Sequence, residues 1–292
     1  MRSEEEIKKI IIDKAVADER IRAILLNGSR ADSKIPPDKY QDFDIVYIVD
    51  KLASFTSDHN WTNIFGEKIV WQLPDEMGPP QKAGNENYSF TYLILFKDGN
   101  RIDLTLFAKD KIQTSFHKDS LTIVWLDKDN IFLNINKPSD VDYLVKKPIL
   151  EEFADACNEF WWVSTYVSKG LLRNEIAYSK ELLETVVRPM FMKIIEWFIG
   201  TETNFSVAFG KGGKFMQNHL PAALYQKILS TYSNHEPENN WKALFIMTEL
   251  FGQLASIVAE KLDFKYNADE EINVKEWLAK SFEGRKHQKI KR

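Results

Sequence analysis

The hydrophobic and polar positions in the first third of the chain predict a helix followed by a sheet. Residues 3–19 have helical spacing, and Ser3 and Glu6 are placed to form a capping box. From Ile21 to about Phe107 the pattern changes to short runs rich in β-branched and aromatic residues, which favour strands. The clearest of these predicted strands are 24–26, 42–49, 92–96 and 101–106.

From Glu151 onward, apolar residues recur with helical spacing and few strand signals remain. Pro189 lies inside one of these patterns, so we expect a kink or a break there. Gly200 is a plausible C-terminal stop for the same helix. The predicted helices are 151–169, 175–199, 213–232, 240–261 and 270–282.

The two patterns together predict an α+β protein of two domains. We expect a mixed sheet with flanking helices over residues 1–148, and a helical bundle over 149–283. Residues 284–292 form a basic tail, most simply a frayed terminus. Residues 73–87 are rich in proline, glycine and asparagine and predict a long surface loop.

The composition is that of an ordered globular protein. Hydrophobic residues make up 44% of the 292 residues, and aromatic residues 13%. The formal net charge of −4 argues against nucleic acid as the main partner. The only cysteine, Cys157, has no internal disulfide partner, the N-terminal segment is charged, and no apolar run of membrane length is evident. We therefore expect a cytoplasmic protein with no nucleic-acid or membrane partner.

The most informative local pattern is Gly28-Ser29-Arg30, which follows a short buried strand. Glycine lets the backbone come close to a phosphate, and Ser29 offers a hydroxyl and an N–H to a phosphate oxygen. If a helix opens at Ser29, its free N–H groups face the same anion. The pattern therefore indicates a phosphate site at the end of this strand.

Three aspartates complete the pattern. Asp42 and Asp44 lie two residues apart at the start of a predicted strand, so their side chains point to the same face, about 7 Å apart. Asp103 lies on another predicted strand. Carboxylates with this spacing suit Mg²⁺ shared with a polyphosphate. Each signal alone is weak, because an Asp-x-Asp pair is most often a solvated strand end, but their order and strand context favour a nucleotide and metal site.

The first predicted helix of the second half carries candidate acceptor-binding residues on one face. Asp155 and Glu159 lie four residues apart, and Trp162 continues the same stripe. Carboxylates pair with ammonium or guanidinium groups, and aromatic faces attract cations. The alternative is structural: acidic residues favour the first turn of a helix, and Trp161 and Trp162 are good core residues.

Two further features of the second half have both a functional and a structural interpretation. Glu175 is either an acid at a helix N-terminus or a side chain that reaches into a cleft between the domains. The glycine-rich run 209–215 contains Lys211 and Lys214, which can present positive charge to phosphates. The alternative for this run is a flexible surface turn. We favour Lys214 over Lys211 as a phosphate ligand.

Taken together, these residues resemble the aminoglycoside 6-adenylyltransferases of the polymerase-β-type nucleotidyltransferase superfamily, which inactivate streptomycin. The resemblance extends along nearly the whole chain. One departure is a phenylalanine, Phe43, in place of tyrosine, on the strand face opposite the carboxylates. The strings that carry the resemblance are 26–31, 41–45, 63–66, 96–106, 157–162 and 210–214.

The resemblance implies a polymerase-β-like first domain and transfer of AMP from ATP to the 6-hydroxyl of streptomycin, with Mg²⁺. Asp103 is the candidate base, ligand or both. The residues expected to act are Asp42, Asp44 and Asp103 in catalysis and metal binding, Gly28, Ser29, Arg30 and Lys214 in nucleotide binding, and Asp155, Glu159, Trp162 and Glu175 in binding the acceptor.

Two other functions stay open on the sequence alone. One is nucleotidyl transfer to a different acceptor, such as another aminoglycoside, a protein side chain or a nucleic-acid end. The other is a non-catalytic nucleotide-binding module with the same fold. The presence of all three carboxylates counts against the second alternative.

Overall fold

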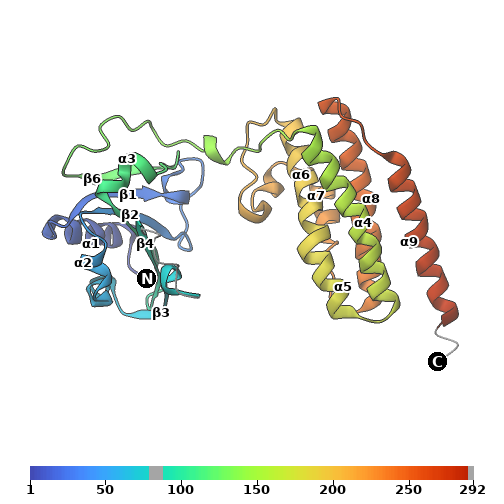
Figure 1. The fold of residues 1–292 in the computed structure, drawn as a ribbon, viewed down its shortest axis with the longest axis horizontal. Coiled ribbons are helices and arrows are strands. Elements are labelled where there is room, and N and C mark those ends of the chain that lie inside the picture. The colour runs from blue at the N-terminus through green and yellow to red at the C-terminus, as the bar shows by residue number, and fades with distance from the viewer. Residues whose placement is uncertain (79–87, 289–292) are drawn as a thin grey trace. The chain divides into compact units, whose positions relative to one another are not determined.

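The chain folds as two compact units, Met1–Asp142 and Tyr143–Arg292. A computed structural model describes residues 1–78 and 88–288. The first unit is a mixed sheet with short helices, and the second is built from helices (Figure 1). Each has its own hydrophobic core. The predicted α+β class is confirmed.

The N-terminal unit is organised around a six-stranded sheet with the order β3-β4-β5-β2-β1-β6. Neighbouring strands are antiparallel, except that β2 and β5 are parallel. The four predicted strands are found as β1, β2, β4 and β5, whereas β6 lies beyond the predicted end of the sheet. The strands are β1 Ile21–Asn27, β2 Phe43–Val49, β3 Lys68–Gln72, β4 Ser89–Phe96, β5 Arg101–Ala108 and β6 Ile123–Asp127.

Alternation along the strands gives the sheet two apolar faces. Helix α1 (Glu4–Ala17) packs Ile7 and Ile11 on the face that contains Ile45 and Leu104. The predicted capping box is present at its start. The opposite face contains Val46 and packs against Ile112 of helix α3 (Ile112–Ser115). The remaining short helix, α2, spans Ala53–Thr56.

This alternation decides where the predicted carboxylates lie. Asp44 is two residues before Val46, and Asp103 is four residues before Phe107, which belongs to the same cluster as Val46. Side chains an even number of positions apart on a strand share a face. Asp44 and Asp103 therefore lie on the α3 face of the sheet, near the ends where β2 and β5 begin.

The C-terminal unit buries its core between long helices. Phe160 of α4 stacks on Phe251 of α8 with ring centroids 3.6 Å apart, and Trp161 is fully buried. Cys157 is also buried, in agreement with a structural role. The helices are α4 Leu150–Leu172, α5 Ile176–Leu182, α6 Arg188–Glu202, α7 Ala222–Leu229, α8 Pro237–Leu262 and α9 Ala268–Gln288.

Three helix boundaries differ from the prediction. The segment 175–199 is broken by a π-helical turn, Leu183–Val187, which comes directly before α6 with Pro189 in its first turn. Helix α6 continues through Gly200 to Glu202, because Gly200 adopts a helical conformation there. The predicted helix 213–232 is wrong: Pro221 cannot continue a helix from the preceding residues, and only α7 follows it.

The last two helices, α8 and α9, also differ from the prediction. Helix α9 continues past Phe282 to Gln288, so the first residues of the predicted frayed tail are helical. Helix α8 is long and apolar enough to cross a membrane by length and composition, contrary to our expectation, but 61% of its apolar window is buried inside the protein. This is typical of a core helix. Residues 79–87 of the predicted surface loop lie outside the described residues.

Candidate functional site

The centre of the candidate site is the contact between Gly28 and Asp44. Strand β1 ends at Asn27, whose cross-strand partner in β2 is Asp44. Gly28 then turns the chain with a φ of 72°, a conformation that side chains rarely adopt. A Cβ atom on Gly28 would lie 2.2 Å from Oδ2 of Asp44. Glycine is therefore required here both by the backbone and by the neighbouring carboxylate.

The parallel pair β2–β5 brings the second carboxylate alongside the first. Asp44 and Asp103 are direct partners in the register of these strands. Asp42 precedes β2 and shares their face. Arg101, two residues before Asp103, donates to both Asp103 carboxylate oxygens at 2.7 and 2.8 Å, and its Nε lies 3.6 Å from Oδ2 of Asp42. Asp42, Asp44 and Asp103 thus lie together where the interior strands β2 and β5 begin, and we call this place the carboxylate edge. It also contains Arg101, which the sequence analysis did not consider.

The carboxylates repel one another in a partly buried setting. Burial, followed by the charges of Asp103 and Asp42, raises the pKa of Asp44 to about 6. Burial also raises the pKa of Asp42, and the nearby Arg101 guanidinium opposes that shift. Arg101, with a weaker contribution from Arg30, therefore opposes three carboxylates, and this edge keeps excess negative charge. Such an edge favours an added cation.

The arrangement differs from the predicted metal site in one respect. Across residues 1–78 and 88–288, no group of three or more histidine, cysteine, aspartate or glutamate side chains is arranged as a metal site. Asp103 and Asp42 instead lie against Arg101. The residue types still fit Mg²⁺, because carboxylates supply the hard oxygen ligands that this ion prefers.

The sequence alone allowed a helix opening at Ser29, but the structure has only a short turn there. The Arg30 side chain links this turn to the loop before β2. Residues Gly28–Ala31 form one 3-10 turn. The Arg30 guanidinium donates to the backbone oxygens of Asp42 and Gln41 at 3.0 and 2.8 Å, and it lies over the Phe43 ring. Its side chain is only 7% exposed. These contacts give Arg30 a positioning role for the Asp42 loop, and its nucleotide contact stays a prediction.

The candidate acceptor-binding residues of the helical unit lie on its surface. Asp155, Glu159 and Trp162 are exposed on α4, and Trp162 is 58% exposed. Trp162 packs edge-on against Tyr166, with ring centroids 5.8 Å apart. Trp161, in contrast, is a core residue whose indole N–H donates to the Tyr266 hydroxyl. The structural alternative is thus confirmed for Trp161 and wrong for Trp162.

Glu175 and the glycine-rich loop 209–215, called the Gly-Lys loop below, lie in different parts of the helical unit. Glu175 is exposed just before α5 and makes no side-chain cap. Gly210, Gly212 and Gly213 all have positive φ, which bends the loop back on itself. The loop lines a cavity of about 580 Å³. The cavity is lined by Tyr143, Glu184, Arg188, Pro189, Met192, Lys193, Glu196, Phe209, Gly210, Lys211, Gly212 and Tyr232.

Lys211 lines this cavity, whereas Lys214 does not belong to its lining. The Lys214 ammonium lies 4.9 Å from the centre of the Phe215 ring, and its side chain is exposed. Lys214 was preferred in the sequence analysis because the sequence alone does not show this cavity. Its lining comes from segments far apart in the chain, so no local pattern could have found it.

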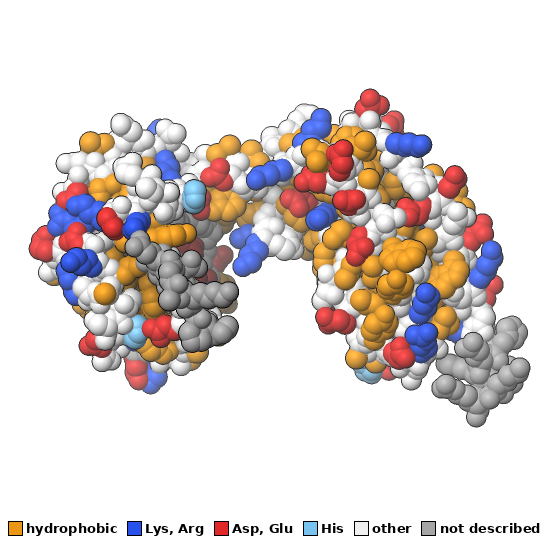
Figure 2. All heavy atoms as spheres, in the orientation of Figure 1, with side chains coloured by type: hydrophobic (Ala, Val, Ile, Leu, Met, Phe, Trp, Pro, Cys, Tyr) orange, Lys and Arg blue, Asp and Glu red, His pale blue; other side chains and the backbone are white. Residues whose placement is uncertain are grey.

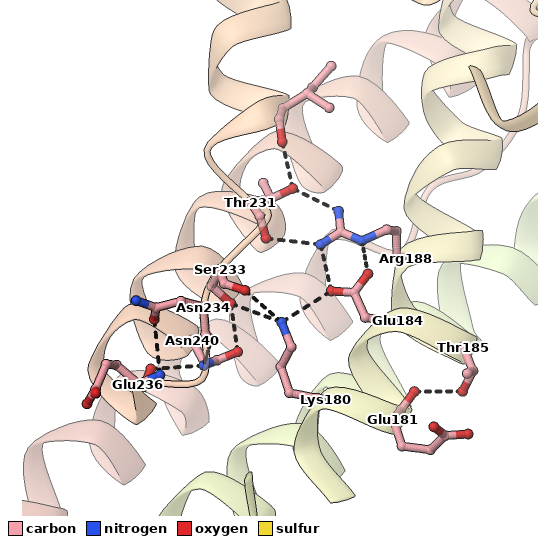
Figure 3. A network of polar contacts seen from close by, with 11 residues as sticks. Lys180, Glu181, Glu184, Thr185, Arg188, Thr231, Ser233, Asn234, Glu236 and Asn240 are labelled. Carbon is pink, nitrogen blue, oxygen red and sulfur yellow. Dashed lines mark hydrogen bonds and ion pairs between the residues drawn. The ribbon is translucent and has the colours of Figure 1, made fainter. Parts of the chain in front are cut away.

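One wall of the cavity is a network of hydrogen bonds (Figure 3). The Arg188 guanidinium pairs with both carboxylate oxygens of Glu184 and donates to the Thr231 hydroxyl and carbonyl at 2.9 and 3.0 Å. Lys180 lies 3.7 Å from Glu184 and donates to the Ser233 carbonyl at 2.9 Å. Because Arg188 is buried, these contacts fix its position and that of Glu184.

Comparison with known proteins gives one consistent family. The family model "Streptomycin adenylyltransferase" matches residues 1–281. An aminoglycoside 6-adenylyltransferase of Bacillus subtilis (strain 168) is 43% identical over 91% of this chain and 93% of its own length. One of Campylobacter jejuni is 40% identical, over 94% of each chain. A crystal structure of an aminoglycoside 6-adenyltransferase from Bacillus subtilis is 37% identical over 97% of this chain and 99% of that chain, with a TM-score of 0.47.

The agreement between the matched region and the site geometry supports a single conclusion. The match begins at residue 1 and covers both units, including the Gly28 turn, all three aspartates and the Gly-Lys loop. The relatives are similar over nearly their full length. The chain therefore belongs to the streptomycin adenylyltransferase family of enzymes.

Proposed function

We propose that this protein transfers AMP from ATP to the 6-hydroxyl of streptomycin, in the cytoplasm, and so inactivates the antibiotic. The observation that carries the proposal is the Gly28–Asp44 contact beside Asp103, in a chain of this family. Relatives at 40–43% identity are named aminoglycoside 6-adenylyltransferases, which supports an aminoglycoside acceptor. The choice of streptomycin follows the family's description.

In this reaction the acceptor hydroxyl oxygen forms a bond to the α-phosphorus of ATP. The bond from that phosphorus to the bridging oxygen breaks, and pyrophosphate leaves with the electron pair. The hydroxyl proton goes to a carboxylate, for which Asp103 is our candidate. Both Asp103 oxygens accept from Arg101 in this structure. Arg101 must therefore turn to another anion, and the phosphates of the nucleotide are suitable partners.

The carboxylate edge has the groups to hold a charged nucleotide. Asp42, Asp44 and Asp103 would hold Mg²⁺, which when bound neutralises charge on the α-phosphate and the departing pyrophosphate. Gly28 lets the backbone turn directly beside the Asp44 carboxylate, which places the next residue, Ser29, at the same site. The Ser29 hydroxyl makes no hydrogen bond with the described residues, so it is available to a phosphate oxygen. Lys214 adds a positive charge for pyrophosphate.

The acceptor needs carboxylates and aromatic surface, because an aminoglycoside is a cationic sugar. The exposed face of α4 offers Asp155, Glu159 and Trp162, and Glu175 is exposed nearby in sequence. Holding the hydroxyl against the α-phosphate supplies much of the rate by proximity. On the face that Figure 2 shows, acidic and basic side chains are interspersed on each unit. This pattern does not favour a nucleic-acid acceptor, which binds to basic surfaces.

The proposal is tested with a panel of acceptors. The intact protein is incubated with ATP, Mg²⁺ and one aminoglycoside at a time, and pyrophosphate and the product mass are measured. We expect pyrophosphate only with streptomycin and close analogues, and a product heavier by one AMP minus water. Release with a different aminoglycoside alone would replace the acceptor. No release with any of them would contradict the proposed function.

A further inference from the structure

The cavity in the helical unit has the size and construction of a ligand site. Its volume of about 580 Å³ is within the range of small-molecule pockets, which is roughly 300–1,000 Å³. Its walls come from α6, the Gly-Lys loop, the π-helical turn and Tyr232. All of these belong to one compact unit. The cavity therefore exists independently of the N-terminal unit.

The cavity has two carboxylates, and one is already neutralised. Glu184 forms ion pairs with both Arg188 and Lys180, as Figure 3 shows. Arg188 has further fixed partners in Thr231. Glu184 thus has little capacity for an additional cation.

The second carboxylate, Glu196, has no such partner. It is half-buried and makes no hydrogen bond or ion pair with the residues that the structure describes. Burial raises its pKa, and the charge of Lys193 on the same helix only partly opposes this shift. A partly buried carboxylate without a partner is costly. A cationic ligand group would relieve that cost.

Two lysines also line the cavity, but their effect is weaker. Lys193 and Lys211 are exposed, so solvent and salt screen their charges, whereas Glu196 is half-buried. The aromatic lining adds to the preference for a cation. Tyr143 and Tyr232 line the cavity and are 46% and 51% exposed, and the Arg188 guanidinium, 3.8 Å from the centre of the Tyr232 ring, shows that this ring accepts a cation. Aromatic rings of this kind attract cations and cover sugar rings.

We propose that this cavity binds a cationic group of the acceptor aminoglycoside, and that Glu196 is the carboxylate that pairs with it. This inference rests on the proposed function and adds a determinant of acceptor specificity outside the α4 face. Glu196 would hold the acceptor without touching the reacting hydroxyl. Its loss should therefore weaken acceptor binding and leave ATP binding unchanged.

The experiment measures binding of streptomycin to the intact protein by calorimetry, without ATP. We expect Glu196→Gln to weaken binding about 10–100-fold, the usual range for losing a hydrogen bond to a charged partner. The matched control is Glu181→Gln, which removes one exposed carboxylate from the same unit, outside the cavity lining. It should bind within about twofold of the wild type. Glu196→Asp, which keeps the charge, should recover part of the affinity.

Steady-state kinetics on the same variants separate the inference from the proposed function. If the wild type transfers AMP and Glu196→Gln raises the KM for streptomycin but not for ATP, the inference is supported. If Glu196→Gln behaves as the wild type, or raises the KM for ATP instead, the inference is wrong and the proposed function stands. If the wild type transfers no AMP to any aminoglycoside, both are wrong. Thermal unfolding checks that each variant is folded.

Discussion

Asp44 combines three environmental effects in one side chain. It is partly buried, it is a direct partner of Asp103, and it lies against the Gly28 backbone. Burial, followed by the charges of Asp103 and Asp42, raises its pKa to about 6 from an ordinary value of 3.8. When a group binds its proton more tightly in the folded state, the folded protein loses stability as the pH rises from the unfolded pKa to the folded pKa of that group. The carboxylate is therefore kept at a cost to the free protein.

The Asp44→Asn variant tests this cost. Between about pH 4 and pH 6.5 the wild type should lose up to about 3 kcal/mol from ionisation of Asp44, because the folded pKa is raised by about two units. Asparagine does not ionise. With a metal chelator present, the variant should therefore gain in Tm relative to the wild type as the pH rises from 4.5 to 7.5.

The matched control is Asp13→Asn, which removes a carboxylate that is 60% exposed on α1. It should follow the wild type at both pH values. Thermal unfolding followed by circular dichroism gives the comparison. An equal difference in Tm between Asp44→Asn and the wild type at both pH values would show that Asp44 is not under this strain.

At the scale of elements, the critical junction is the end of β1. The strand delivers Gly28 to the point where β2 begins, and the 3-10 turn that follows is braced by Arg30. The backbone there needs a positive φ, and the space for a side chain is taken by Asp44. The sequence signal of a strand followed by Asn27-Gly28 therefore corresponds to a real constraint.

Gly28→Ala should damage this junction twice. Alanine at a φ of 72° costs on the order of 1–3 kcal/mol, and its Cβ would displace the Asp44 carboxylate. We expect a lower Tm and a loss of AMP transfer of at least tenfold. The control Gly99→Ala has a similar φ of 85° but meets only the flexible end of Met1, 3.0 Å away. It should lose stability and keep most of its transfer activity. Equal transfer in both variants would contradict the role of the Gly28–Asp44 contact.

The sequence predicted elements well where the pattern is local. The capping box at Ser3, the strands on either side of Gly99 and the strand that begins after Asp42 all follow from neighbours in the chain. The helix predicted over 213–232 failed because Pro221 outweighs the apolar spacing around it. The break near Pro189 was expected, but its form as a π-helical turn was not.

The site was predictable only in part, because much of it depends on contacts between residues far apart in the chain. The sequence placed Asp42 and Asp44 on one face, but the register that pairs Asp44 with Asp103 depends on a parallel contact between distant strands. The capture of Asp103 by Arg101 was visible as a two-residue spacing and was overlooked. The cavity at Glu196 combines Glu184, the Gly-Lys loop and Tyr232. Helix packing alone brings these together.

At the scale of the molecule, the chain consists of two units that contribute different chemistry. In the proposed function, the sheet unit supplies the carboxylates for the metal and the triphosphate, and the helical unit supplies the surfaces for the cationic sugar. Membership of one enzyme family over residues 1–281 unites them in a single function. The central claim is that AMP transfer to streptomycin depends on the carboxylate edge.

That claim is tested most directly by product formation in the wild type and Asp44→Asn side by side. Each protein is mixed with ATP, Mg²⁺ and streptomycin, and adenylylated streptomycin is quantified by mass spectrometry. The wild type should form it. Asp44→Asn should lose at least about a thousandfold in rate while it stays folded, because it removes a carboxylate that would hold Mg²⁺, the ion that neutralises the phosphate charge. Transfer at a wild-type rate by Asp44→Asn would contradict the account.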